Sequence, residues 1–183
     1  MHFTCAARTD VGIVRSGNED NYLMLSDHGI FIVADGMGGH AAGEVASEMA
    51  VRITSQAIGS LRGLSDEEAG ERVRSAIRAA NDAIFERTLS EQDKRGMGTT
   101  ATVLVLLPDR YLIGQVGDSR AYLVRDGVVG RLTEARAAIV SGPVSLFAQR
   151  HHTNRDLDVF GLEATLSRDP TPLDIRCVDC SPQ

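Results

Sequence analysis

Two short apolar runs near the amino terminus predict a pair of β-strands. They are YLMLS at 22–26 and GIFIVAD at 29–35, and the SDHG segment that joins them has the composition of a hairpin turn. The second run ends at Asp35, which is followed at once by the glycine-rich segment 36–39 and then by His40. A buried strand that ends on a carboxylate and a nearly bare backbone loop can present that carboxylate and a main-chain carbonyl to a ligand.

The period of the apolar positions changes beyond Glu44 and predicts two helices. Apolar residues recur every four positions as far as Gly59, which indicates a first helix. Ser65 and Glu68 have the spacing of a capping box, and the apolar stripe behind them predicts a second long helix that runs to about Leu89. The second stripe consists of Ala69, Val73, Ala76, Ile77, Ala80 and Ile84.

Three further strand candidates follow the second helix. They are TTATVLVLLPD at 99–109, RYLIGQVGDS at 110–119 and RAYLVRDG at 120–127, which ends in the turn signal Asp126-Gly127. LDIRCV at 173–178 predicts one more strand from its alternation. Because the strands come in adjacent groups around a helical pair, the sequence predicts an α+β fold with helices packed on antiparallel sheets.

Composition adds that the chain is an ordinary globular protein. Its 183 residues are enough for one well-buried domain and too few for two, with 43% hydrophobic and 24% charged residues. The net charge of −6 argues against a general electrostatic grip on nucleic acid or on an anionic membrane.

The start of the chain and its cysteine count favour a reducing compartment. No stretch approaches the roughly 20 apolar residues of a membrane span. The start has no apolar core of signal-peptide length, so we expect a cytoplasmic protein. Three cysteines are an odd count and too few for a disulfide framework. Cys177 and Cys180 form a C-x-x-C downstream of His151 and His152, which we interpret as coincidence because no second pair has zinc spacing.

Three polar clusters stand beside predicted strands, at 14–22 (VRSGNEDNY), 33–40 (VADGMGGH) and 116–120 (VGDSR). Hydrolysis of a phosphate ester requires an activated water and positive charge around the phosphoryl oxygens, and two divalent ions about 3.5–4 Å apart supply both. Mg²⁺ and Mn²⁺ prefer oxygen ligands. The clusters offer carboxylates at positions 20, 35 and 118, and an unobstructed carbonyl at Gly36.

The same clusters offer groups for substrate and proton transfer. Arg15 can grip a phosphate bidentately, and His40 can act as a general acid for the leaving alkoxide. Each piece alone has an ordinary interpretation as a turn, a salt bridge or a cap. DGMGGH could also be the phosphate-cradling loop of a nucleotide-binding protein, but it lacks the P-loop spacing and lysine.

Four motifs in order carry a family resemblance. RSGNED at 15–20, VADGMGGH at 33–40, GMGTTA at 96–101 and VGDSRAYL at 116–123 resemble the bacterial branch of the PPM family, the type 2C metal-dependent protein serine/threonine phosphatases. The resemblance runs from about residue 4 to residue 133. It implies a β-sandwich of two antiparallel sheets flanked by helices, in α-β-β-α layers. It also implies a binuclear Mn²⁺ or Mg²⁺ centre that hydrolyses phosphoserine and phosphothreonine in proteins through a metal-activated water, without a phosphoenzyme.

The resemblance also implies a set of metal ligands. Asp35 corresponds to the carboxylate that bridges the two ions, and the Gly36 carbonyl would bind one of them. Asp20, with Glu19 beside it, would serve the other ion directly or through water. Asp118 corresponds to a residue associated with a third, weaker metal.

Further roles follow from the same motifs. Arg15 matches the arginine that binds the substrate phosphate, and His40 matches the proposed general acid. Residues 98–100 would be structural and begin a core strand beside the site. The natural counterparts would be phosphorylated proteins and the serine/threonine kinases that modify them.

The resemblance is lost beyond Arg131. No Ser-Asp-Gly and no Asp-Asn follows, although these motifs usually carry two further metal ligands of the family. We therefore expect a phosphatase domain at 1–133 and a divergent or truncated segment at 134–183. None of the carboxylates in that segment has the expected neighbours, so none is assigned as a ligand: Asp156, Asp158, Asp169, Asp174 and Asp179.

Three interpretations account for this departure. The favoured one is a truncated or frame-altered product of a phosphatase gene, and the second is a natural short variant with a rebuilt tail. The third is a catalytically inactive phosphatase-like domain that binds phosphoproteins or another partner. The sequence thus predicts a Mn²⁺/Mg²⁺-dependent protein serine/threonine phosphatase whose activity is reduced if two carboxylates are missing.

Overall fold

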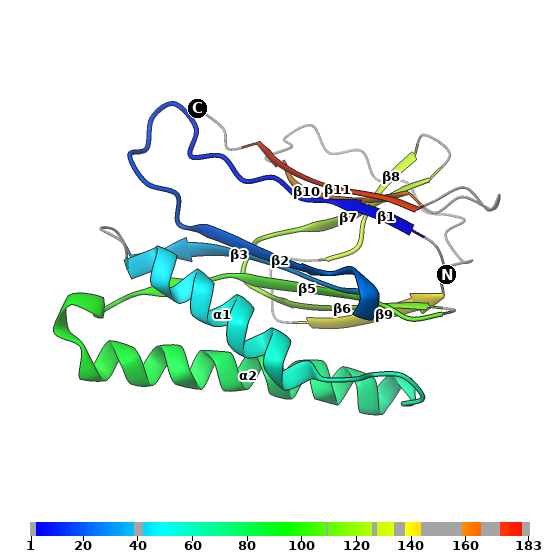
Figure 1. The fold of residues 1–183 in the computed structure, drawn as a ribbon, viewed down its shortest axis with the longest axis horizontal. Coiled ribbons are helices and arrows are strands. Elements are labelled where there is room, and N and C mark those ends of the chain that lie inside the picture. The colour runs from blue at the N-terminus through cyan, green and yellow to red at the C-terminus, as the bar shows by residue number, and fades with distance from the viewer. Residues whose placement is uncertain are drawn as a thin grey trace.

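The protein is a sandwich of two β-sheets with two helices on the outer face of one sheet (Figure 1). This predicted α+β architecture is confirmed by the computed structural model. Among the described residues, helices cover only one of the two sheets, so the second outer helical layer of the predicted α-β-β-α arrangement is not seen there. The structure describes residues 3–38, 42–108, 110–125, 128–133, 138–143, 159–165 and 173–180.

The helix-covered sheet is antiparallel throughout. Its strands lie in the order β2-β3-β5-β6-β9, and the short β4 pairs with the end of β3. The bounds are β2 Asp20–Leu25, β3 Ile30–Met37, β4 Gly98–Thr99, β5 Ala101–Leu106, β6 Arg110–Val116 and β9 Ala138–Pro143. The hairpin predicted around SDHG is confirmed, with a short 3₁₀ helix at Ser26–His28 in the turn.

The second sheet is mixed, which differs from the antiparallel pairing predicted from the sequence. β1 pairs with β11 in parallel, and β10 pairs with β7 in parallel. These partners are far apart in the chain, so no tight hairpin forces them to run in opposite directions. The order is β1-β11-β10-β7-β8, with bounds β1 Phe3–Ala6, β7 Ala121–Arg125, β8 Val128–Arg131, β10 Val159–Thr165 and β11 Leu173–Cys180.

Both predicted helices are present. α1 spans Ala42–Ile58 and α2 spans Asp66–Ser90, and a 3₁₀ turn at Gln92–Lys94 leads to β4. At the start of β6, Arg110 pairs with Asp66 in the first turn of α2 and donates a hydrogen bond to the Leu64 carbonyl oxygen. No helix in the described part of the chain is long and apolar enough to cross a bilayer.

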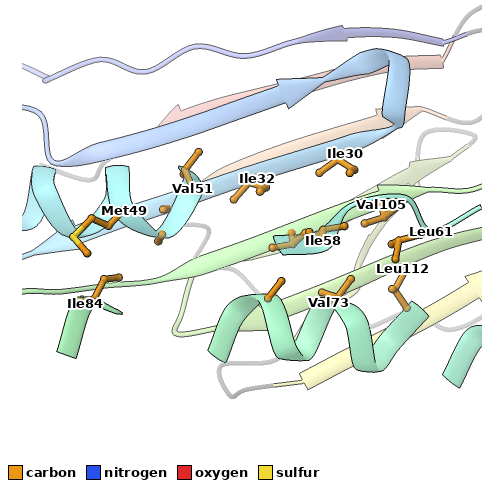
Figure 2. Packing of buried hydrophobic residues seen from close by; sticks show 14 of the residues in the cluster. Ile30, Ile32, Met49, Val51, Ile58, Leu61, Val73, Ile84, Val105 and Leu112 are labelled. Atoms are coloured by element: carbon orange, nitrogen blue, oxygen red, sulfur yellow. The ribbon is translucent and has the colours of Figure 1, made fainter. Parts of the chain in front are cut away.

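Alternation along β3 divides the buried side chains between two cores. Ile30 and Ile32 face the helices and pack in the same cluster as Ile58 and Val73, as Figure 2 shows. Phe31 faces the other way and packs with Leu104, Ile113 and other residues between the two sheets. Because successive side chains of a strand point to opposite faces, the odd-numbered positions of β3, including Asp35, belong to the inter-sheet face.

The sequence predicts the part of the chain beyond residue 131 least well. The strand predicted at 173–178 is present as β11, whereas the sequence predicts neither β9 nor β10. Neither segment 138–143 nor segment 159–165 carries a long alternation, and the first one ends in the turn signal Ser-Gly-Pro, so their strand state depends on pairing with β6, β7 and β11. The predicted turn at Asp126-Gly127 and the histidines at 151 and 152 lie outside the described residues.

The capping box at the start of α2 yields a pH-dependent prediction. The Ser65 hydroxyl accepts from the Glu68 amide at 3.3 Å, and the Glu68 carboxylate accepts from the Ser65 amide at 2.9 Å. The Ser65 hydroxyl also donates to the Glu68 carboxylate at 2.8 Å. The two bonds that this carboxylate accepts lower the pKa of Glu68 below its ordinary value of 4.5, and the bond from the Ser65 amide is the larger cause. The contribution of Glu68 to stability is therefore full above pH 4.5 and is lost as the pH falls through the lowered pKa.

We expect an NMR titration of Glu68 to give a pKa below 4.5 in the folded protein. Ser65→Ala removes the hydroxyl bond and should move that pKa part of the way back. The neighbouring Glu67, which takes no part in the box, is the internal reference. A Glu68 pKa at its ordinary value in the unsubstituted protein would contradict the capping box.

A candidate metal centre at the tips of β2 and β3

Asp20 and Asp35 are directly opposite one another across the β2–β3 ladder. The neighbouring pair is hydrogen-bonded, since the Gly36 amide donates to the Glu19 carbonyl oxygen at 3.1 Å. The Asp20–Asp35 pair is therefore of the non-hydrogen-bonded kind, in which the Cα atoms lie about 4.5 Å apart and the side chains are closest. Both carboxylates share the inter-sheet face at the end of the sandwich, and both are half-buried.

The main chain of Asp35 is held by the two threonines that precede β5. The Thr100 hydroxyl accepts from the Asp35 amide at 3.0 Å, and the Thr100 amide donates to the Asp35 carbonyl oxygen at 2.8 Å. The Thr99 hydroxyl donates to the same carbonyl oxygen at 2.9 Å. These three bonds hold the main chain of Asp35 in place, in agreement with the structural role expected of residues 98–100.

The donor set of this pair fits a hard divalent cation. Two carboxylates directly opposite one another repel, and a cation between them converts the repulsion into attraction. Carboxylate oxygens are also the ligands that Mg²⁺ and Mn²⁺ prefer. Among the described residues, no group of three or more His, Cys, Asp or Glu side chains gathers as a metal site.

Glu19 does not join the pair, although it precedes Asp20 in the chain. Its side chain lies on the helix side, where a Cβ atom at Gly43 would come within 2.9 Å of both Glu19 carboxylate oxygens. Gly43 is in the first turn of α1, and the amino end of a helix attracts negative charge. The role of Glu19 as a ligand stays a prediction, and the structure places the carboxylate at the helix start.

Gly36 is required by a close approach of two backbones. A Cβ atom at Gly36 would lie 2.1 Å from the Gly43 carbonyl oxygen and 2.6 Å from that of Glu19. The buried Ser47 hydroxyl of α1 donates to the same Glu19 carbonyl oxygen at 2.6 Å. The start of α1 is thus docked on the tips of β2 and β3. From the sequence, Gly36 was predicted only to offer its carbonyl oxygen to a metal ion, and that role stays a prediction.

Asp118 lies at the same end of the sheet as the acidic pair. The carboxyl ends of β3 and β6 meet there because each strand is antiparallel to β5, on the left side of Figure 1. Asp118 is exposed in the turn between β6 and β7, and the adjacent Ser119 is buried. The Ser119 hydroxyl lies 2.6 Å from the Thr100 hydroxyl, which connects this turn to the residue that holds Asp35.

The structure says less about Arg15 and His40, the residues predicted to bind the substrate phosphate and to transfer a proton. Arg15 is exposed in the loop between β1 and β2. In that loop the Asn18 side chain accepts from the Asp20 amide at 3.0 Å, which shapes the entry into β2. His40 lies outside the described residues, so its role as the general acid stays a prediction.

Several residues of this site had no functional signal in the sequence. Ser47 and Ser119 look like ordinary helix and turn residues, and Gln115 like a polar residue in a strand. All three are buried in the structure. One hint in the sequence is that Gln115 is a polar residue inside the otherwise apolar run YLIGQV. The partners of all of them come from distant segments.

Comparisons with known proteins identify relatives of the chain. The family model described as Protein phosphatase 2C matches residues 15–157. Serine/threonine protein phosphatase PstP of Mycobacterium tuberculosis is 41% identical over 133 residues, which are 70% of this chain and 24% of that protein. Serine/threonine phosphatase stp of Listeria monocytogenes is 43% identical over 136 residues, which are 72% of this chain and 54% of that protein.

A solved structure agrees in fold. The catalytic domain of the serine/threonine protein phosphatase PstP in complex with two manganese ions matches with a TM-score of 0.65 and 29% identity, over 74% of this chain and 70% of that chain. The present chain spans about a quarter of the Mycobacterium tuberculosis relative and about half of the Listeria one.

The close approach of Gly36 to α1 predicts a large effect of one methyl group. Gly36→Ala would press a Cβ atom against the backbone of Gly43 and Glu19, and neither can rotate away. We expect a loss of at least about 2 kcal/mol in the free energy of unfolding, measured by urea denaturation. Gly17→Ala is the matched control, because nothing lies within 4 Å of its Cβ position and it should stay within about 1 kcal/mol. Equal stability of the two variants would contradict the docking of α1 described above.

Proposed function

Because the chain belongs to the protein phosphatase 2C family, we propose that it hydrolyses phosphate esters of serine and threonine in proteins with the help of Mn²⁺ or Mg²⁺. The observation that carries the proposal is the pair Asp20 and Asp35, directly opposite one another at the end of the inter-sheet face. A cation held by that pair would lie at one end of the sandwich, the end at which Asp118 also lies.

The residues of the chain divide the work. Asp20 and Asp35 would hold the cation, and the threonines before β5 keep Asp35 in place. Divalent ions at such a site would lower the pKa of a bound water molecule and would neutralise negative charge on the phosphoryl oxygens. Arg15 is exposed and free to turn its guanidinium toward a phosphate, which it can bind through two parallel hydrogen bonds. His40 would return a proton to the leaving alkoxide.

The ions and partners are proposed on the same basis. Two Mn²⁺ ions are present in the matching PstP structure, which supports a binuclear centre here, with Asp118 near a third position. The relatives are named serine/threonine phosphatases, which supports phosphoproteins as substrates and serine/threonine kinases as the enzymes that produce them. A cytoplasmic location is proposed from the sequence alone.

Replacement of one carboxylate tests the proposal directly. Asp35→Asn keeps the shape of the side chain and removes a negative ligand, so Mn²⁺ affinity and Mn²⁺-dependent hydrolysis of an aryl phosphate should fall roughly 100-fold or more. Asp27→Asn is the matched control, since Asp27 is exposed in the turn at the other end of the same hairpin. Calorimetry gives the affinity, and a colorimetric assay gives the turnover.

The outcomes separate the proposed enzyme from the two other interpretations of the sequence. Turnover that Asp35→Asn abolishes and Asp27→Asn leaves intact supports the enzyme. Absence of turnover from a folded, Mn²⁺-loaded protein that binds a phosphopeptide would instead support a phosphoprotein-binding domain. Affinity for a nucleotide that does not depend on Asp35 would favour a nucleotide-binding loop.

Removal of the phosphate-binding guanidinium should separate substrate binding from metal binding. Arg15→Ala is expected to raise KM for a phosphopeptide roughly tenfold, because a charge-assisted bidentate contact is lost. Mn²⁺ affinity should stay unchanged. Arg8→Ala serves as the control, since Arg8 is an exposed arginine of the same loop that pairs with Asp10. Reduced Mn²⁺ affinity in Arg15→Ala would argue against the assigned role.

A further inference from the structure

Thr100 is the residue through which two separate parts of the site touch. It directly precedes β5, and only 2% of its surface is exposed. On one side its hydroxyl accepts from the Asp35 amide at 3.0 Å. On the other side the same hydroxyl lies 2.6 Å from that of Ser119, and either of the two can donate. One buried oxygen atom therefore contacts both the strand of Asp35 and the turn that carries Asp118.

The methyl group of Thr100 makes a second contact with that turn, which comprises residues 117–120. Gly117 adopts a φ of +98°, and a Cβ atom placed there would lie 2.7 Å from Thr100 Cγ2. The Thr100 side chain is thus seated on the turn by both of its branches, the hydroxyl on Ser119 and the methyl on Gly117. A residue that lacked either branch would leave the turn less constrained.

The turn itself is held rigid by a glutamine in the adjoining strand. Gln115 is 1% exposed, and its Nε2 donates to the carbonyl oxygens of Gly117 at 3.1 Å and Ser119 at 2.6 Å. The Thr133 hydroxyl accepts from the Ala121 amide at 2.9 Å, which fixes the exit of the turn into β7. A displacement of Ser119 would therefore carry Asp118 with it.

From these contacts we propose that Thr100 is a positioning residue that couples Asp35 to the turn of Asp118, so that divalent-cation affinity at both carboxylates depends on its hydroxyl. This inference rests on the proposed function, since it assigns Thr100 a role toward the cation that Asp20 and Asp35 would hold. Thr100 itself contacts neither the cation nor the substrate. It acts through the Asp35 amide and the Ser119 hydroxyl, as residues that orient metal ligands do.

The adjacent strand position offers a matched control. Thr102 is 3% exposed on the same face of β5, but its hydroxyl has no hydrogen-bond partner among the described residues. Thr100→Val and Thr102→Val make the same change, replacing a hydroxyl by a methyl of similar size. Only the first removes hydrogen bonds to Asp35 and to the turn. A loss of packing alone would affect both variants equally.

The test is a calorimetric Mn²⁺ titration of the purified full chain. Thr100→Val is expected to weaken Mn²⁺ binding roughly 10- to 100-fold. Thr102→Val should bind within about twofold of the unsubstituted protein, and Thr100→Ser, which keeps the hydroxyl, should restore most of the affinity. Hydrogen exchange of the Asp35 amide without metal should be faster in Thr100→Val and unchanged in Thr102→Val.

Coupling is measured by a double substitution. Asp118→Asn should reduce Mn²⁺ affinity less in the Thr100→Val protein than in the unsubstituted one, because the turn is already released. Independent effects of the two substitutions would overturn the coupling. If Thr100→Val does not fold, Ser119→Ala replaces it, because this substitution breaks the same hydroxyl contact from the turn. An unchanged Mn²⁺ affinity in Ser119→Ala would then overturn the inference.

The result also distinguishes this inference from the proposed function. If the unsubstituted protein binds Mn²⁺ and hydrolyses an aryl phosphate while Thr100→Val binds Mn²⁺ equally well, the role of Thr100 is wrong and the proposed function stands. If the unsubstituted protein binds no Mn²⁺, both are wrong.

Discussion

The register of β2 against β3 is the constraint on which the candidate site depends. It sets Asp20 opposite Asp35, and a slip of one residue would turn one carboxylate toward the helices and leave the other between the sheets. The register is specified by the apolar residues further along the same strands. Ile30 and Ile32 are buried under the helices while Phe31 is buried between the sheets, so any slip would exchange two well-packed faces. The core of the protein thereby determines where the two charges stand.

The polar end of the sandwich is held by hydrogen bonds to main-chain atoms, some from backbone amides and some with threonine and serine hydroxyls. Asp35 is bound at its amide and its carbonyl oxygen by Thr99 and Thr100, and the Glu19 carbonyl oxygen accepts from Gly36 and Ser47. The two acidic strand tips are therefore rigid before any cation binds. Ligands held in place in advance favour the binding of a divalent ion. The architecture favours a site that is formed in advance.

Neighbours in the chain and neighbours in space differ at this site. Glu19 and Asp20 are consecutive, yet strand alternation sends the first toward α1 and the second toward the inter-sheet face. Asp35 and Asp118 are far apart in the chain, yet one threonine connects the strand of the first with the turn of the second. The neighbouring residues Glu19 and Asp20 of the NED motif therefore lie on opposite faces of the sheet.

Local pattern was enough to determine the helices, the capping of α2, the β2–β3 hairpin and the strands β5, β6 and β7, because each depends on periodicity and turn chemistry within a few residues. It did not predict β1. The ordered motifs were enough for the family and for the choice of Asp20, Asp35 and Asp118 as candidates. Only the tertiary structure decided the parallel pairing in the second sheet, the separation of Glu19 from the pair, and the contact between Thr100 and Ser119. Each of these depends on contacts between segments distant in the chain, and their free energy is not encoded in any single segment.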